Sequence, residues 1–145
     1  MPDFSFSIRL DVRFRDCDSQ GHVNNAVWFT YLEQCRLLFW RHMTGGAPNP
    51  HSRVIVARAE CDYRAPAHFG EQLEIRLTVG DIGRSSFQLL YEIVNVASGA
   101  RLADAKSVMV TYDYDAGKSV PIPTKTRELL ERFRPPQEPA HAPVE

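Results

Sequence analysis

A short stretch from Asp18 to Asn25 holds most of the residues in this chain that could carry out chemistry. It sets a carboxylate (Asp18), a glycine (Gly21), an imidazole (His22) and two amides (Asn24 and Asn25) directly before an apolar helix. The start of a helix offers backbone N–H groups without acceptors and a partial positive charge. Negative charge that develops on an ester or thioester oxygen needs donors of this kind. The layout therefore favours an acyl-transfer site.

The elements that must position these residues are a strand before them and a helix after them. Apolar and polar residues alternate from 4 to 14, which predicts a strand with one buried face. Apolar residues recur at three- and four-residue spacing from 27 to 43, which predicts a helix buried on more than one stripe. The glycines and prolines from 45 to 50 favour turns and end that helix.

The rest of the chain predicts a sheet and a short helix. Alternating patterns predict strands at 55–63, 73–79, 87–93 and 102–114, and a terminal helix at 124–133. The strand at 55–63 would turn its small residues, such as Ala57 and Ala59, inward, where a helix could approach closely. One long helix between strands joined by tight turns indicates an α+β domain, with an antiparallel sheet curved around the helix. We expect one domain over residues 1–134 and a disordered, Pro-rich tail over 135–145.

One segment resembles the first motif of a known family, the hotdog-fold acyl-CoA thioesterases of the 4-hydroxybenzoyl-CoA thioesterase-like group. It reads Asp-x-x-Gly-His-Val-Asn-Asn from Asp18, and Tyr31, Glu33 and Arg36 follow as Tyr-x-Glu-x-x-Arg. Weaker similarity continues over most of residues 4–123, including the segments 63–70 and 83–86. The resemblance implies a hotdog fold: a five-stranded antiparallel sheet wrapped around one long central helix, with a short C-terminal helix. It also implies a homodimer or homotetramer, and pairing would cover an exposed sheet edge.

The same resemblance implies roles for the residues of the motif. Asp18 would either attack the thioester carbonyl or activate water as a general base, although Asp also caps turns and helices. The backbone N–H of Asn25 would be the oxyanion donor. Asn24 could cap the helix, hold His22 or orient water, and His22 could bind the carbonyl, position water or pack beneath the acyl chain. Gly21 is expected to adopt a positive φ in the sharp turn.

Further residues are candidates for binding the substrate. Trp28 is expected to shape the acyl pocket and to influence the preference among acyl groups. Coenzyme A carries a pyrophosphate and a 3′-phosphate, so its site needs cations near the rim. The candidates for contacts with coenzyme A are Arg64, His68, Arg84 and Ser86. Each of them could equally be a solvated strand end or part of a hairpin start.

Composition excludes several other functions. The formal net charge of −1 over 145 residues removes any general electrostatic argument for binding nucleic acid. The first residues carry no cationic leader, and nowhere do eighteen apolar residues follow one another, so we expect no membrane insertion and a cytoplasmic location. Three cysteines without CxxC spacing favour reduced thiols over a disulfide framework or a zinc site.

Three classes of function remain. The first is hydrolysis of a thioester of coenzyme A or of acyl-carrier protein, which needs no cofactor other than the coenzyme A of the substrate. The second is a hydratase or dehydratase on the same fold, and the third is a noncatalytic acyl-CoA-binding module. Glu33, on the helix, is the reserve catalytic group if Asp18 proves dispensable.

Overall fold

The computed structural model describes residues 3–46 and 53–135. Its elements follow the predicted order. They are β1 (Phe6–Asp11), a 3-10 turn η1 (Phe14–Asp16), α1 (Val27–Met43), β2 (Val54–Tyr63), β3 (Gln72–Ile82), β4 (Ser86–Asn95), β5 (Arg101–Asp113), β6 (Lys118–Ser119) and α2 (Thr124–Arg132). The predicted tail, apart from Pro135, lies outside the described residues.

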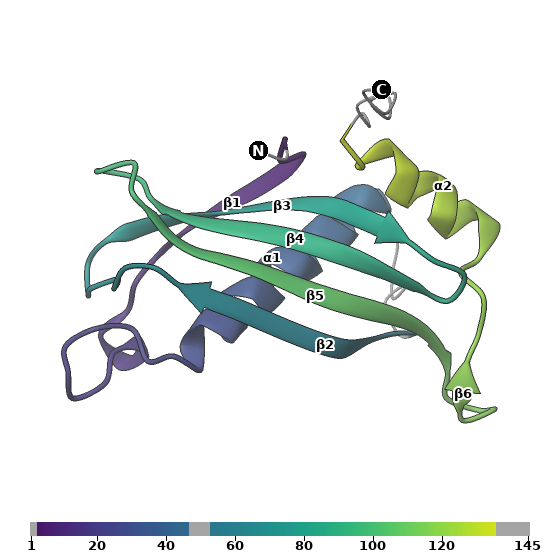
Figure 1. The fold of residues 1–145 in the computed structure, drawn as a ribbon, viewed down its shortest axis with the longest axis horizontal. Coiled ribbons are helices and arrows are strands. Elements are labelled where there is room, and N and C mark those ends of the chain that lie inside the picture. The colour runs from purple at the N-terminus through teal and green to yellow at the C-terminus, as the bar shows by residue number, and fades with distance from the viewer. Residues whose placement is uncertain (1–2, 47–52, 136–145) are drawn as a thin grey trace, which may run out of the picture.

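The strands form one antiparallel sheet in the order β1-β3-β4-β5-β2, and the short strand β6 pairs with β5. Figure 1 shows α1 lying across one face of this sheet, and α2 beside the end of the sheet where α1 finishes. This arrangement confirms the predicted antiparallel sheet around one long helix. Sequence patterns missed β6, because two residues are too few to alternate.

The core lies between α1 and the inner face of the sheet. The buried residues of α1 recur three or four apart, so they fall on one side of the helix. They are Trp28, Tyr31, Leu32, Cys35, Phe39, Trp40 and Met43. Every second residue of β3 and β4 faces them, including Ile75, Leu77, Leu89 and Ile93. At the far end of α1, the ring of Phe39 packs edge-on against that of Phe133, 5.3 Å away, so the segment after α2 closes the core there.

The predicted first strand was too long. It ends at Asp11, and Phe14 is 79% exposed in η1 instead of lying on a buried strand face. The physical reason is local, because the carboxylate of Asp16 accepts a hydrogen bond from the backbone N–H of Arg13 at 3.0 Å. This bond folds the chain into a turn where simple alternation would continue the strand.

The prediction that β2 turns small residues into the core holds only in part, because Cys61 packs against the core but Ala57 and Ala59 are exposed. Among the described residues β2 is the edge strand next to β5 and has no strand on its other side. The register also shifts between Val56 and Arg58, which interrupts the alternation assumed from the sequence.

The packing of α1 predicts a clear difference between two leucines of the same helix. Leu32 is 2% exposed and Leu38 is 38% exposed. The Leu32→Ala variant should lose about 2–5 kcal/mol of free energy of unfolding, because it leaves a cavity in the core. The Leu38→Ala variant makes the same chemical change at a half-exposed site and should cost less than half as much. Urea denaturation of both variants measures this, and equal losses would contradict the described core.

Candidate active site

The turn before α1 is built on a buried carboxylate. Asp16 is 3% exposed, and it forms an ion pair with the guanidinium of Arg13 at 2.9 Å. The hydroxyl of Tyr31, on the buried side of α1, donates to the same carboxylate at 2.8 Å. Burial raises the pKa of Asp16, but the hydrogen bonds from Arg13 and Tyr31 outweigh it and hold that pKa below its usual range. Asp16 therefore joins the strand end to the helix as a charged anchor.

The chain from Asp16 to Asn24 then closes on itself. The carbonyl of Asp16 accepts a hydrogen bond from the N–H of Asn24 at 2.9 Å. Inside this loop the N–H of Asp18 donates to the carbonyl of His22 at 3.0 Å, and the N–H of Gly21 donates to the carbonyl of Asp18 at 3.0 Å. Gly21 has a φ of +84°, the left-handed conformation that the sequence predicts for it. Asp18 and His22 are thereby held on one tight turn.

The chain turns at Asn24 just before α1. The side-chain oxygen of Asn24 accepts from the N–H of Ala26 at 2.9 Å, and the carbonyl of Asn24 accepts from the N–H of Val27 at 2.9 Å. The N-cap of α1 is Ala26 and its cap carries no side-chain hydrogen bond from the described residues, so the Asn24 side chain fixes this turn and the three roles considered for it stay predictions. The hydroxyl of Tyr63, at the end of β2, donates to the carbonyl of Asn25 at 2.6 Å. Among the described residues, the N–H of Asn25 has no acceptor.

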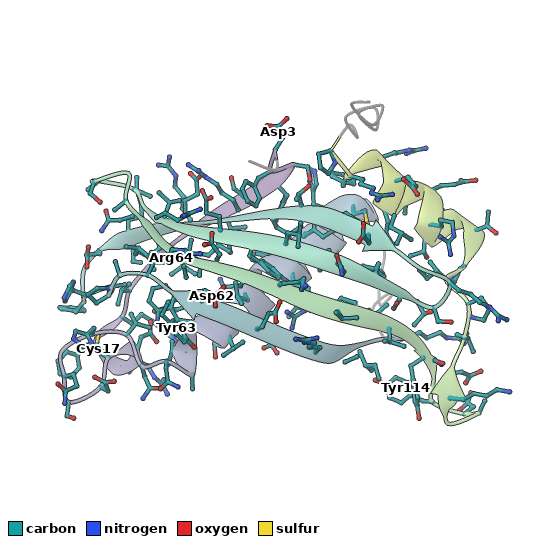
Figure 2. All side chains as sticks on the ribbon, viewed as in Figure 1. Asp3, Cys17, Asp62, Tyr63, Arg64 and Tyr114 are labelled. Atoms are coloured by element: carbon teal, nitrogen blue, oxygen red, sulfur yellow. The ribbon has the colours of Figure 1, made fainter. Side chains whose placement is uncertain are left out.

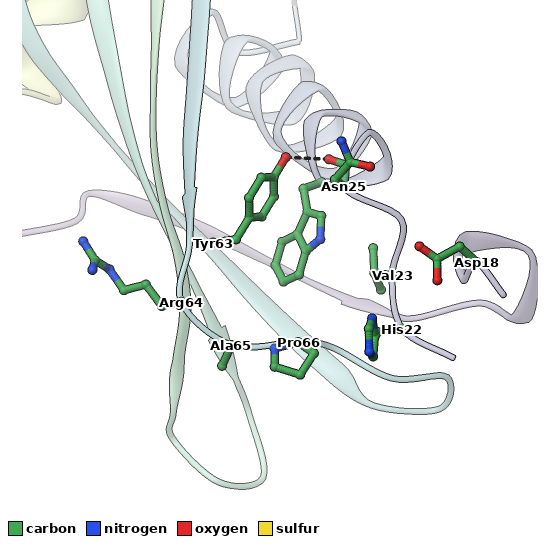
Figure 3. Close-up of a pocket in the computed structure, with 9 residues that line it drawn as sticks. Asp18, His22, Val23, Asn25, Tyr63, Arg64, Ala65 and Pro66 are labelled. Atoms are coloured by element: carbon green, nitrogen blue, oxygen red, sulfur yellow. Dashed lines mark hydrogen bonds between the residues drawn. The ribbon is translucent and has the colours of Figure 1, made fainter. Parts of the chain in front are cut away.

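A cavity of about 370 Å³ lies where this turn, the start of α1 and the end of β2 meet. Figure 3 shows Asp18 and His22 on one side of it and Tyr63 and Arg64 on the other, with the hydrogen bond from Tyr63 to Asn25 drawn across. The residues that line it are Asp18, His22, Val23, Asn25, Trp28, Tyr63, Arg64, Ala65 and Pro66. A half-buried carboxylate and a free backbone N–H therefore share one cavity.

Five of the predicted site residues line this cavity: Asp18, His22, Asn25, Trp28 and Arg64. Gly21 and Asn24 belong to the turn before α1 and form hydrogen bonds with its backbone. Tyr63, Val23, Ala65 and Pro66 were not predicted as site residues. For Tyr63 a signal existed, because it opens the strand-end segment 63–70 whose pattern resembles the thioesterase family.

Two of the residues predicted to contact coenzyme A already have carboxylate partners. Arg64 is among the residues that line the cavity, and its guanidinium forms an ion pair with Asp104 on β5. His68 lies just beyond the lining residues, and its ring packs edge-on against that of His22 with 5.8 Å between the centroids. The Nδ1 of His68 is 2.7 Å from a carboxylate oxygen of Glu71. Both residues thus lie near the cavity with a defined orientation.

Arg84 and Ser86 lie elsewhere in the single chain. They belong to the hairpin between β3 and β4, which Figure 1 shows at the end of the sheet opposite the start of α1. Figure 2 shows that Tyr63 and Arg64 lie near the other end of the sheet, far from Tyr114 after β5. Contacts of Arg84 and Ser86 with coenzyme A stay a prediction.

The helix carboxylate Glu33 lines a second cavity, of about 220 Å³, together with Arg36, Leu37 and residues of β2 and β5. Arg36 does not pair with Glu33 within the described residues, and its guanidinium donates instead to the hydroxyl of Tyr91 at 3.5 Å. Glu33 is thus separate from the Asp18 cavity within one chain.

Two of the three cysteines, Cys35 and Cys61, are not thiolate nucleophiles at neutral pH. All three are free thiols. Burial raises the pKa of Cys35 to about 12 and that of Cys61 to about 11, so both remain protonated. Cys35 and Cys61 are therefore poor candidates for the reacting group.

The fold defines the class of the protein, because an antiparallel sheet around one long helix is the hotdog architecture. Residues 12–132 match the family model of the Thioesterase-like superfamily. The chain belongs to that superfamily and is a thioester hydrolase. This confirms the family that the Asp18 motif resembles.

Individual relatives agree with this assignment. The chain is 31% identical over 127 residues to the uncharacterized protein YsmA of Bacillus subtilis, which covers 88% of this chain and 86% of YsmA. It is 27% identical over 103 residues to the acyl-CoA thioesterase YbgC of Helicobacter pylori, covering 71% and 77% of the two chains. A crystal structure of a thioesterase from Thermus thermophilus, complexed with coenzyme A and Zn, superposes with a TM-score of 0.79 at 32% identity. It covers 88% of this chain and 98% of the other.

No helix within residues 3–46 and 53–135 has the length and apolar character needed to cross a bilayer.

The Asp16 anchor predicts a specific dependence of stability on pH. Because the pKa of Asp16 is lowered on folding, its contribution is fully present above the unfolded value of about 4 and is lost as pH falls through the folded value below that. The Asp16→Asn variant should lose about 1–3 kcal/mol of free energy of unfolding at pH 7, since it weakens bonds to a buried charge.

The difference between wild type and Asp16→Asn should then shrink as denaturation is repeated below pH 4. Asp11→Asn is the matched control, because Asp11 is exposed on the adjoining strand. It should change stability by less than about 0.5 kcal/mol. A loss for Asp16→Asn that is the same at every pH would mean that the carboxylate charge is not the anchor.

Proposed function

We propose that the protein hydrolyses acyl-CoA thioesters to a free acid and coenzyme A, with Asp18 as the catalytic carboxylate. One observation supports this above the others: the carboxylate of Asp18 and the unpaired N–H of Asn25 border the same cavity. A thioester carbonyl between them would have an anion on one side and a hydrogen-bond donor at a helix start on the other.

The proposed reaction begins when the thioester carbonyl oxygen accepts a hydrogen bond from the N–H of Asn25. As a nucleophile attacks the carbonyl carbon, the oxygen becomes negative and this bond strengthens. Asp18 acts in one of two ways. It attacks the carbon itself, expelling the thiolate and forming an anhydride that water then hydrolyses, or it takes a proton from a water molecule that attacks. Both routes give one acid and one thiol.

His22 belongs to the same proposal as a substrate-facing residue. Its ring lines the cavity beside Asp18, within reach of a bound carbonyl or of the attacking water. Trp28 forms part of the cavity wall and is only 3% exposed. Its indole fills space that an acyl group would otherwise occupy. We therefore expect Trp28 to influence which acyl groups are accepted.

Coenzyme A is the favoured carrier because a related thioesterase from Thermus thermophilus has been crystallised with it. Arg64 on the cavity wall would meet the pyrophosphate, although it would then share its charge between the phosphate and Asp104. Acyl-carrier protein ends in the same pantetheine arm and remains the alternative carrier. His68, Arg84 and Ser86 stay candidates for the outer part of the coenzyme. The reaction needs no further cofactor, and the free thiols fit a reducing compartment such as the cytoplasm.

We also propose that two copies pair through their β2 edges. Within residues 3–46 and 53–135, β2 bonds to β5 alone, which leaves its outer N–H and C=O groups without strand partners there. Exposed apolar side chains lie beside that edge, with Val56 at 44% and Leu37 at 50% exposure. Pairing along β2 would cover both and would also supply the exposed Ala57 and Ala59 with neighbours. A tetramer would then be two such pairs.

The dimer is tested by the mass of the protein in solution. Sedimentation should give two chains, or four, for the wild type. The Val56→Asp variant should shift the population toward single chains, because it places a charge on the apolar edge. Tyr114→Asp, at an exposed position just beyond β5, should leave the mass unchanged. A wild type that sediments as one chain would refute the pairing.

The catalytic assignment is tested by thiol release from a panel of short, long and aromatic acyl-CoAs. The Asp18→Asn variant should lose at least about a hundredfold in kcat, since the amide preserves the shape but cannot act as an anionic base or nucleophile. Asp115→Asn, on the distant β5–β6 hairpin, is the matched control and should retain the wild-type rate.

Undiminished rates for Asp18→Asn would reject the assignment and direct attention to Glu33. Conversion of an enoyl-CoA without thiol release would favour a hydratase. Tight acyl-CoA binding without turnover would favour a noncatalytic binding module.

A further inference from the structure

Tyr63 occupies a place that the proposed reaction does not yet use. It is the last residue of β2, and its ring packs edge-on against Trp28 with 5.8 Å between the ring centroids. Its hydroxyl reaches across the cavity to the carbonyl of Asn25, at 2.6 Å, as the dashed line in Figure 3 shows. This contact joins the sheet to the start of the helix, 38 residues apart in the chain.

The carbonyl that Tyr63 binds lies just before the helical hydrogen-bond pattern. Asn25 precedes Ala26, the N-cap of α1, and the first N–H groups of a helix bond no earlier than the carbonyl of the N-cap. The N–H of Phe29 accordingly donates to the carbonyl of Ala26, at 3.2 Å. Within the described residues no backbone N–H donates to the Asn25 carbonyl, so the phenol of Tyr63 is the donor that satisfies it.

The two peptide units around Asn25 are consequently held by three bonds. The carbonyl of Asn24 accepts from Val27, which fixes the unit that ends in the N–H of Asn25. The next unit is held at both ends, since Tyr63 binds the carbonyl of Asn25 and the Asn24 side chain binds the N–H of Ala26. In a trans peptide the N–H points opposite to the carbonyl. Because the Asn24 carbonyl points along the helix toward Val27, the N–H of Asn25 points out of the helix start.

We propose that Tyr63 is a positioning residue for thioester hydrolysis: its hydroxyl holds the peptide unit that follows Asn25, and this keeps the preceding unit, which carries the Asn25 N–H, in a fixed orientation toward the reacting oxygen. The inference rests on the proposed function, because it assigns a purpose to the oxyanion donor of that reaction. Without the hydroxyl, the Asn25 carbonyl is free to rotate, and this rotation changes the angle between the two peptide units that meet at Asn25. Stabilisation of an oxyanion depends on donors that are fixed before charge develops.

The chemistry of Tyr63 suits this role. Burial raises the pKa of the phenol above its usual value, and the neighbouring Cys61 raises it further, so the hydroxyl keeps its proton at neutral pH. Its single proton is used by the Asn25 carbonyl, which leaves the substrate to the N–H of Asn25. Tyr63 therefore acts through Asn25 and not on the thioester itself.

The test compares wild type, Tyr63→Phe and Tyr112→Phe. The first variant removes the hydroxyl and keeps the ring against Trp28, and the second makes the same change near the far end of β5. Tyr63→Phe should lower kcat for acyl-CoA by about tenfold or more, which is less than the roughly hundred- to thousandfold expected for loss of the donor itself. Its KM should stay within about twofold, since the bond acts on the transition state rather than on ground-state binding. Tyr112→Phe should match the wild type in both constants.

A second measurement, by NMR on the free protein, follows the bond itself. In Tyr63→Phe the carbonyl carbon resonance of Asn25 should move, and the amide of Ala26 should exchange with solvent faster, while both are unchanged in Tyr112→Phe. These changes together with the selective loss of kcat would support the inference. Unchanged resonances, a wild-type kcat, or a loss confined to KM would each overturn it.

The two proposals fail in different ways. If the wild type releases thiol from no acyl-CoA, the proposed function is wrong and the role of Tyr63 falls with it. If the wild type is active and Asp18→Asn is not, but Tyr63→Phe keeps the full rate, the proposed function stands and only the role of Tyr63 is wrong.

Discussion

The buried carboxylate of Asp16 is the contact on which the geometry of the site depends. It binds Arg13, which follows β1, and Tyr31, which lies on α1. The backbone carbonyl of Asp16 accepts a hydrogen bond from the N–H of Asn24. A buried anion without its two partners would be costly, so the Asp16 carboxylate ties the position of Arg13 to that of Tyr31. The start of the turn is thereby joined to the buried side of α1.

The consequence is a site whose two halves are fixed by different means. Asp18 is placed by the tight turn that closes at His22 and needs the positive φ of Gly21. The N–H of Asn25 belongs to the peptide unit whose carbonyl binds the N–H of Val27, and the next unit is held by the Asn24 side chain and by Tyr63 from the sheet. Neither half relies on a long flexible side chain. A donor and an anion held in this way have little reorganisation to undergo when charge develops on a substrate.

Patterns of local sequence predicted much of this arrangement. The helix bounds, the strand order along the chain and the turn at Gly21 follow from periodicity and from the conformational freedom of glycine, which are local properties. The motif from Asp18 to Asn25 indicated the cavity because its residues are neighbours in the chain. The pairing of β2 with β5 was beyond local patterns, and so the exposure of Ala57 and Ala59 was predicted wrongly.

The contact of Tyr63 with Asn25 was hidden from the sequence for the same reason, since it joins two elements that only the fold brings together. Asp16 was missed for another reason. Its buried state depends on Arg13 and Tyr31, and a single aspartate beside a turn carries no sign of burial. Arg84 and Ser86 lie at the opposite end of the sheet because of the order in which the strands are connected. The residues around them in the sequence do not indicate this position.

The central claim is that the Asp18 carboxylate and the Asn25 N–H act on one carbonyl group. A crystal structure with a coenzyme A analogue in which a methylene replaces the reacting sulfur tests this most directly, because the ketone cannot be hydrolysed. The account predicts the ketone oxygen about 2.7–3.1 Å from the nitrogen of Asn25. It also predicts an Asp18 carboxylate oxygen, or a water bound to it, about 3–3.5 Å from the ketone carbon. A ketone bound beside Glu33 in the second cavity, with the Asp18 cavity empty, would contradict it.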